Sequence, residues 1–325
     1  MFERRGRDGG EVPRLVAIET TSRCNATCSF CPYPHKETEK SAMDQALFEK
    51  IVDDCTRFPL AKVEPLLNGE PFVDPRIAER LEHIRRRLPR TTLHLVTNGN
   101  AMVPRRADEI VDMGGVDRLI ISLNTLSPVI YRDVMGLDLE RTLHNIRHVL
   151  EPARRRRIAR RIYVRMVRRP DSTLAEQDEF LAFCRVNRVR PFILAQHNYK
   201  GDIDSTLPVP RHPCQMLDRV DILSDGRVAL CCSDAEGKYA WGDVRTQSVL
   251  DIYRGEVARR YRDAHRGGRR GELEPCSGCN VVWPDLTGMP PVRTLVAAAQ
   301  FAAYVVRHRP LGRSAPERRR LPVIG

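Results

Sequence analysis

The stretch TSRCNATCSFCPYP, residues 21–34, brings Cys24, Cys28 and Cys31 within eight positions of the chain. It directly follows RLVAIE, residues 14–19, a short apolar run rich in branched side chains that predicts a β-strand. Thiolates held at this spacing on a loop can bind one metal centre. The cysteine loop is therefore the first candidate for a functional site.

Two kinds of metal centre fit three closely spaced cysteines. A structural zinc ion needs four protein ligands, and His35 stands four residues after Cys31 as a candidate for the fourth. A 4Fe-4S cluster held by three cysteines instead leaves one iron without a protein ligand. An iron without a protein ligand indicates catalysis. The sequence around the cysteines is needed to choose between a zinc site and a 4Fe-4S cluster.

Strand-like and helix-like patterns alternate after the cysteine loop. Further strands are expected at 62–68, 92–98, 118–124, 161–167 and 191–196. Helices are expected at 43–55, 74–87, 104–113 and 174–187, with Asp44 as an N-cap and more helical sequence up to about residue 150. Strand–helix units in series indicate a parallel sheet with right-handed crossovers. Residues 14–205 are therefore predicted to form an α/β fold, a partial (β/α)6 TIM-like barrel.

The cysteine motif resembles that of the radical S-adenosylmethionine superfamily. The resemblance rests on the Cys24-x3-Cys28-x2-Cys31 spacing, on Phe30, and on the position after the first strand of a βα series. It implies that the three cysteines hold a 4Fe-4S cluster and that S-adenosylmethionine chelates the open iron. One electron then cleaves the sulfonium to methionine and a 5′-deoxyadenosyl radical, which abstracts a hydrogen from the substrate.

Polar residues at the carboxyl ends of later strands extend the resemblance, because barrel active sites are built there. The segment NGEP, residues 68–71, stands where the family usually carries Gly-Gly-Glu, with Asn68 as a departure. Arg165 either pairs with the carboxylate of the cofactor or faces solvent. The resemblance implies further contacts to S-adenosylmethionine from Gly69, Glu70, Thr97, Asn98, Ser122 and Asn124.

The sequence pattern changes after about Pro208. RVDILSDGRVALCC, residues 219–232, predicts a β-hairpin that turns at 224–226, and residues 248–265 predict one amphipathic helix. Residues 206–285 are therefore expected to form a small separate module. Its four thiols can close a structural zinc site or ligate every iron of a second cluster, and they are Cys214, Cys231, Cys276 and Cys279.

The layout of this module resembles twitch, the short form of the auxiliary-cluster extension called SPASM. The matching features are Gly226-x4-Cys231, the Trp241-Gly-Asp segment and the closing PCSGC. The resemblance implies one auxiliary 4Fe-4S cluster, so that two clusters and S-adenosylmethionine are the expected cofactors. Cys232 adjoins the ligand Cys231, and it either packs as a small apolar residue or faces the active site as a hydrogen donor.

Composition and charge limit the kinds of partner that are expected. The chain has 325 residues with a net charge of +12, no apolar segment typical of a secretory signal, and ten cysteines, which in a cytoplasmic protein indicate metal or catalysis rather than disulfides. The longest apolar stretch, residues 294–306, is too short to span a membrane. Residues 1–13 are expected to be disordered, and residues 286–325 to form a helical and basic tail.

The expected function is that of a radical S-adenosylmethionine oxidoreductase or epimerase. The substrate is expected to be a small polar metabolite such as a sugar, aminocyclitol or nucleotide, anionic to suit the charge, with flavodoxin or ferredoxin as electron donor. Maturation of a ribosomal peptide is an alternative, and a zinc-stabilised nucleic-acid-binding protein is a more distant one. The loop after the sixth strand offers His197, Asn198, Tyr199 and Lys200 as substrate contacts.

Overall fold

The computed structural model describes residues 12–112, 115–155, 161–210 and 213–281. The predicted disordered N-terminus lies almost entirely outside these residues, and the predicted basic tail lies wholly outside them. Within the described part, none of the helices is both long enough and apolar enough to cross a bilayer.

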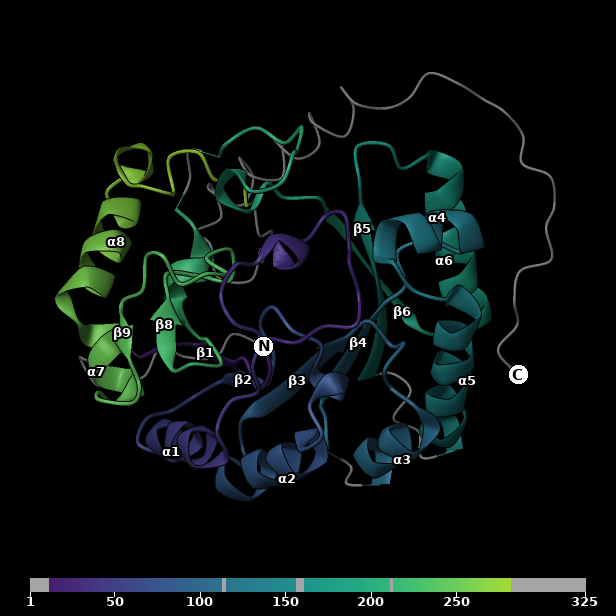
Figure 1. The fold of residues 1–325 in the computed structure, drawn as a ribbon, viewed down its shortest axis with the longest axis horizontal. Helices are drawn as coiled ribbons and strands as arrows, with labels where there is room; N and C mark the ends of the chain where they lie inside the picture. The colour runs from purple at the N-terminus through teal and green to yellow at the C-terminus, as the bar shows by residue number, and fades with distance from the viewer. Residues whose placement is uncertain (1–11, 113–114, 156–160, 211–212, 282–325) are drawn as a thin grey trace.

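One curved sheet of nine strands organises the described residues, in the order β6-β5-β4-β3-β2-β1-β7-β8-β9. From β1 to β6, consecutive strands pair in parallel, which confirms the predicted α/β partial barrel. The helices lie on the outside of the curve, and the cysteine loop lies within it (Figure 1). The six strands are β1 (Leu15–Ile18), β2 (Lys62–Glu64), β3 (Thr92–Thr97), β4 (Arg118–Ser122), β5 (Ile162–Arg168) and β6 (Arg190–Ala195).

The outer helices follow the predicted pattern, with one addition. Asp44 caps α1 through a hydrogen bond from the Leu47 backbone N–H, as predicted. The helical sequence before residue 150 forms two helices, because Gly136 ends α4 with a left-handed φ of 66°. The helices of the barrel are α1 (Gln45–Cys55), α2 (Ile77–Arg87), α3 (Pro104–Asp112), α4 (Pro128–Met135), α5 (Leu139–Arg155) and α6 (Leu174–Val186).

The hairpin continues the barrel sheet. The strand β7 (Arg219–Ile222) pairs in parallel with β1, with Leu15 opposite Arg219. The strands β8 (Arg227–Ala229) and β9 (Gly242–Asp243) then add in antiparallel order. The hairpin of the predicted small module thus extends the barrel sheet. Among the described strands β6 does not pair with β1, so that edge of β1 is open to β7.

The turn and the helix of this region differ in how well they were predicted. The turn lies where it was expected, with Gly226 at a φ of 94°. The single predicted helix is instead two, α7 (Val249–Arg254) and α8 (Glu256–Arg266). Gly255 between them has an extended ψ of 159°, which no continuous helix allows.

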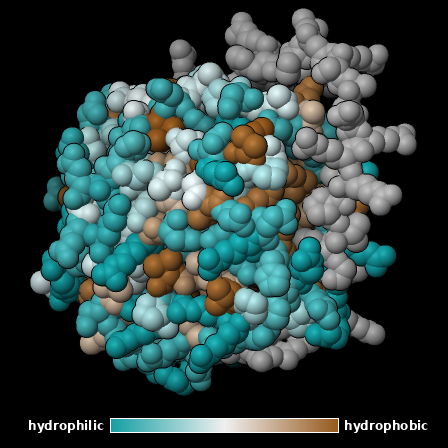
Figure 2. All heavy atoms as spheres, turned by 45° about the vertical axis from the view of Figure 1, so that its right-hand side comes forward, coloured by the Kyte–Doolittle hydropathy of each residue, from teal (hydrophilic) through white to brown (hydrophobic). Residues whose placement is uncertain are grey.

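Burial follows the amphipathic patterns of the sequence. Cys55 of α1 and Cys184 of α6 lie on the apolar sides of their helices and are buried in the core. Hydrophilic side chains cover much of the face seen in Figure 2, with apolar side chains gathered near its centre.

Candidate active site

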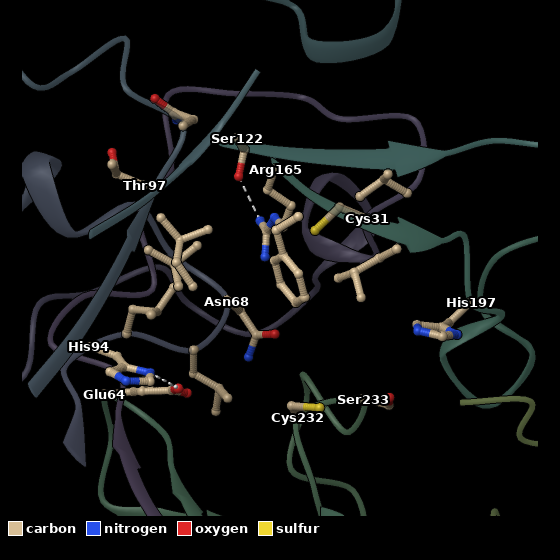
Figure 3. A pocket seen from close by; sticks show the side chains of 18 of the residues that line it. Cys31, Glu64, Asn68, His94, Thr97, Ser122, Arg165, His197, Cys232 and Ser233 are labelled. Atoms are coloured by element: carbon tan, nitrogen blue, oxygen red, sulfur yellow. Dashed lines mark hydrogen bonds and ion pairs between the residues drawn. The ribbon is translucent and has the colours of Figure 1, made fainter. Parts of the chain in front are cut away.

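A cavity of about 520 Å³ lies on the concave side of the sheet. Side chains from several strands and from the cysteine loop point into it (Figure 3). It brings together residues that are far apart in the sequence. The predicted site residues in its wall are Cys24, Cys28, Cys31, Gly69, Glu70, Thr97, Asn98, Ser122, Arg165, His197, Tyr199 and Cys232.

The cysteine loop is held by the segment that follows β2. The backbone N–H of Glu70 donates to the Arg23 carbonyl at 2.8 Å. A Cβ on Gly69 would lie 2.0 Å from the Thr21 carbonyl oxygen, closer than any real contact. Gly69 therefore allows close packing against the cysteine loop. On the loop itself, the Tyr33 hydroxyl accepts from the Cys24 N–H at 2.7 Å.

The three thiols of this loop influence one another. Burial raises the pKa of Cys24 to about 12, and nearby Glu70 and Cys31 add to the rise. Burial also raises the pKa of Cys28, as do the neighbouring Cys31 and Cys24, whereas the positive charge of Arg165 lowers it. In the described residues, which include all ten cysteines, no three His, Cys, Asp or Glu side chains are arranged to hold a metal ion.

Glu70 is the most heavily bonded carboxylate in the cavity wall. It is buried and accepts hydrogen bonds from the Thr97 hydroxyl at 2.6 Å, the Asn98 N–H at 2.7 Å and the Phe72 N–H at 3.1 Å. Burial raises its pKa to about 7 despite these bonds. Thr97 and Asn98 thus orient Glu70, while the Asn98 side chain binds Asn25 at 2.8 Å.

Arg165 faces the cavity, so the solvent-facing alternative does not apply. Its Nη2 donates to the Ser122 hydroxyl at 2.7 Å (Figure 3). Its Nε is buried without a hydrogen-bond partner among the described residues. Burial lowers its pKa, and the nearby Tyr199 and Cys28 oppose that change.

Asn124 lies outside the cavity wall. It is fully buried, with a φ of 63°, and its side chain accepts from the Val167 N–H at 2.8 Å. Its Nδ2 lies 2.9 Å from the Met135 sulfur. The structure thus gives Asn124 a packing role between β4 and β5.

The second cysteine group gathers around a buried arginine. Cys214, Cys231 and Cys232 pack against a small cluster that contains Cys279. Arg270 donates to the carbonyls of Cys276 at 3.3 Å and of Cys279 at 2.5 Å. The Arg270 charge lowers the pKa of Cys214, which burial raises. The Cys214 N–H also donates to Nδ1 of His265 at 3.1 Å.

The two adjacent cysteines differ in their relation to the cavity. Cys232 lines it, whereas Cys231 is not one of the lining residues (Figure 3). The Cys232 sulfur lies 3.6 Å from the Met216 sulfur. Burial raises the pKa of Cys232 to about 12, and the Arg219 charge lowers it.

The loop after β6 contributes two of its four candidate residues to the cavity. His197 and Tyr199 line the wall, and both ring nitrogens of His197 are buried without partners among the described residues. Burial lowers the His197 pKa to about 4. Asn198 instead binds the second cysteine loop at Gly278, and Lys200 forms an ion pair with Asp202.

Sequence reasoning missed the charged residues deeper in the cavity. They occupy alternate positions of their strands, a period-two signal that was readable in KVE of β2 and TLH of β3. The Glu64 carboxylate lies 3.5 Å from His94 Nδ1 and 3.6 Å from the Arg219 guanidinium. The missed residues in the cavity wall include Lys62, Glu64, Thr92, His94, Arg118 and Arg219.

The fold and the site define an α/β-barrel protein with two cysteine-rich centres on either side of one cavity. The Radical SAM superfamily model matches residues 18–183, just over half of the chain, and the chain belongs to that superfamily. The SPASM model, described as an iron-sulfur cluster-binding domain, matches residues 214–280. The expected cofactors, two 4Fe-4S clusters and S-adenosylmethionine, are those of this family, and the zinc-scaffold alternative is wrong.

Curated relatives have several activities. The chain is 22% identical over 274 residues to the S-adenosyl-L-methionine-dependent 2-deoxy-scyllo-inosamine dehydrogenase of Niallia circulans, covering 82% of this chain and 93% of that one. It is 26% identical to the GTP 3′,8-cyclase of Brucella ovis, covering 86% and 76%. A cofactor-modifying protein for tungsten-containing aldehyde ferredoxin oxidoreductase from Pyrococcus furiosus is 36% identical, but the match spans only 31% of that protein.

Solved structures show the same fold. BtrN in complex with AdoMet and 2-DOIA has a TM-score of 0.61 at 18% identity, covering 84% of this chain and 95% of that one. Streptococcus suis SuiB bound to the precursor peptide SuiA has a TM-score of 0.65 at 14% identity, covering 83% and 70%. The fold therefore accommodates both small-molecule and peptide substrates.

The residues present fit the cofactors of the family. The three thiols of the cysteine loop face the cavity next to Arg165, whose unpartnered Nε suits a carboxylate. The buried Arg270 supplies positive charge beside the second group, which suits thiolates.

Proposed function

We propose that the protein removes a hydrogen from a small polar metabolite held in the cavity, and that the outcome is dehydrogenation or epimerisation. The observation that carries the proposal is the position of the cavity, which touches both Cys31 of the first cysteine group and Cys232 beside the second. Its volume, about 520 Å³, is that of a small-molecule site. When bound, the family's cofactors supply a 5′-deoxyadenosyl radical and an electron acceptor.

Residues at the end of the cavity beside the first cysteine loop have separate roles. Cys24, Cys28 and Cys31 hold the first cluster. Glu70 accepts hydrogen bonds from the ammonium of S-adenosylmethionine, because a carboxylate has acceptor sites beyond the three it already uses. Arg165, oriented by Ser122, pairs with the carboxylate of the cofactor.

The residues around the second cysteine group determine whether the substrate is oxidised or epimerised. Cys214, Cys231, Cys276 and Cys279 hold the auxiliary cluster, and a substrate that gives up a further proton and electron becomes oxidised. If the Cys232 thiol instead returns a hydrogen atom to the opposite face of the same carbon, the product is an epimer. The aminocyclitol dehydrogenase, which this chain matches over 93% of its length, supports the first outcome.

Two other substrate classes have support among the relatives. The match to a structure that contains a precursor peptide supports peptide maturation, and the GTP cyclases support a nucleotide. The volume of the cavity favours a small molecule over a peptide, because a peptide needs an extended groove. We further propose a cytoplasmic enzyme that receives electrons from flavodoxin or ferredoxin.

The test is anaerobic purification followed by reduction in the presence of S-adenosylmethionine. We expect a brown protein that releases 5′-deoxyadenosine, and a triple variant of Cys24, Cys28 and Cys31 to Ala that releases none. The matched control is Cys55→Ala, which removes a buried cysteine outside both groups. Candidate substrates labelled with deuterium then transfer the label to 5′-deoxyadenosine.

Two results would contradict the proposal. One is release of 5′-deoxyadenosine by the triple variant at the wild-type rate. The other is label transfer from a precursor peptide and from none of the sugars, aminocyclitols and nucleotides.

A further inference from the structure

The amino-terminal half of the barrel interior is charged, although barrel interiors are usually filled by branched apolar side chains. The registers place Lys62 of β2 opposite Thr92 of β3, and His94 of β3 opposite Arg118 of β4. All four residues line the cavity. Three neighbouring strands thus direct hydrogen-bonding side chains into the same end of it.

The acidic groups nearby already have cationic partners. Arg219 lies 3.6 Å from Glu64 and 2.5 Å from Asp221. Asp218 lies 3.9 Å from Arg266. Glu64 and Asp221 share Arg219, so these three side chains carry one net negative charge, whereas Asp218 and Arg266 cancel. Lys62 and Arg118 add two positive charges, so this end of the cavity is positive overall.

The positions of Lys62 and Arg118 suit an anion between them. The central carbon of the Arg118 guanidinium lies over the Tyr163 ring, 4.7 Å from its centre, a cation–π contact that uses the face of the group and not its N–H donors. His94 is close enough to both cations that each lowers its pKa in addition to burial, whereas Glu64 raises it. His94 thus adds no further charge, and its ring is held by Glu64 at 3.5 Å.

We propose that Lys62, Thr92 and Arg118 bind a phosphate group of the substrate at the amino-terminal end of the cavity. The inference rests on the proposed function, because the substrate is the molecule that loses a hydrogen at the other end. Two cations and a hydroxyl match a phosphate ester, which carries up to two charges and three acceptor oxygens. The neutral His94 donates or accepts one additional hydrogen bond.

The length of the cavity sets the size of this substrate. Arg118 and Ser122 are four residues apart on β4, which is about 13 Å along the strand. Ser122 holds Arg165 at the cofactor end. A phosphate at Arg118 leaves room for a sugar or nucleoside between it and the cysteine loop.

Equilibrium binding of inorganic phosphate to the anaerobic holoenzyme tests the site, with acetate as a second probe. We expect phosphate to bind more tightly than acetate. We expect Lys62→Gln and Arg118→Gln each to weaken phosphate binding about tenfold or more, because each removes a charged hydrogen bond. The matched control is Arg105→Gln on α3, where the Arg105 side chain is 90% exposed and outside the cavity. It is expected to leave phosphate binding unchanged.

Iron content and far-UV circular dichroism show whether each variant is folded. Arg118→Lys keeps the charge but loses the paired N–H groups, so it is expected to bind phosphate with intermediate affinity even if the glutamine variant misfolds. The inference is overturned if the wild type does not bind phosphate, if acetate binds as tightly, or if folded Lys62 and Arg118 variants bind phosphate as the wild type does. The assay uses neither reductant nor S-adenosylmethionine, so its failure is distinct from a failure to form 5′-deoxyadenosine.

Discussion

Asn198 and Asn280 hydrogen-bond to each other in both directions. The Asn198 N–H donates to Asn280 Oδ1 at 2.6 Å, and the Asn280 N–H donates to Asn198 Oδ1 at 3.0 Å. The Asn198 side chain also donates to the Gly278 carbonyl at 2.8 Å, between Cys276 and Cys279. This pair fastens the loop after β6 to the second cysteine group, and it holds the adjacent Tyr199 in the cavity wall.

Asn280→Ala is expected to loosen this connection. The Asn280 side chain is buried and also donates to the Ser205 hydroxyl at 2.9 Å and the Leu207 carbonyl at 3.1 Å. Its removal leaves the Asn198 N–H without its acceptor, at a cost of about 1–3 kcal/mol in the free energy of unfolding. Denaturant unfolding measures the loss. Unchanged stability would show that the pair contributes little.

Gly69→Ala is expected to displace the cysteine loop. The added Cβ would lie 2.0 Å from the Thr21 carbonyl oxygen and 2.8 Å from that of Arg23, and backbone atoms cannot rotate aside. Overpacking of this kind costs about 1–3 kcal/mol, and iron bound by the first cluster falls with it. Gly271→Ala is the matched control, because a Cβ there meets nothing within 4 Å. Equal iron content in the two variants would contradict the prediction.

Much of the fold could be predicted because the sequence patterns that specify it are local. Most of the barrel strands contain a short apolar run, and Asp44 directly precedes the helix that it caps. The strand β2 ends at Glu64 because Pro65 has no N–H with which to continue the ladder, so it is shorter than predicted. The pairing of β7 with β1 joins residues about 200 positions apart, and no local pattern specifies it.

Site residues could be predicted where a sequence motif marked them. They could not be predicted where only tertiary contacts bring them into the cavity. Cysteine spacing marked both cysteine groups as candidate metal ligands from the sequence alone. The roles of Lys62, His94 and Arg118 depend on which face of each strand lines the cavity, which the barrel curvature decides. The role of Asn280 depends on its contact with Asn198, which is 82 residues away in sequence.

Arg165→Met is expected to weaken binding of S-adenosylmethionine about tenfold or more, because it removes a charge-assisted hydrogen bond. The methionine keeps much of the side-chain volume beside Ser122. Equilibrium binding of S-adenosylmethionine to the reconstituted protein measures the change without turnover. Ser122→Ala removes only the 2.7 Å hydrogen bond that orients Arg165, so a smaller loss is expected. Equal affinity of Arg165→Met and the wild type would exclude this arginine from the cofactor site.

His197 is expected to make stability depend on pH. Its pKa is about 4 in the folded protein, below the value of roughly 6.5 in an unfolded chain, so the unfolded state binds more protons in between. The free energy of unfolding should therefore fall as the pH falls from about 6.5 to about 4. His197→Gln removes this part of the dependence, whereas His144→Gln on the outside of α5 keeps it. Identical pH profiles for His197→Gln and the wild type would contradict the prediction.

Alanine variants of the adjacent Cys231 and Cys232 should differ clearly in iron content. Cys231→Ala is expected to lose the auxiliary cluster, about half of the iron, because we propose its thiol as a ligand. Cys232→Ala is expected to keep that iron, because Cys232 lines the cavity. If the product is an epimer, Cys232→Ala stops its formation while 5′-deoxyadenosine is still released. Loss of iron from Cys232→Ala and not from Cys231→Ala would reverse the two roles and leave the cavity without a thiol donor.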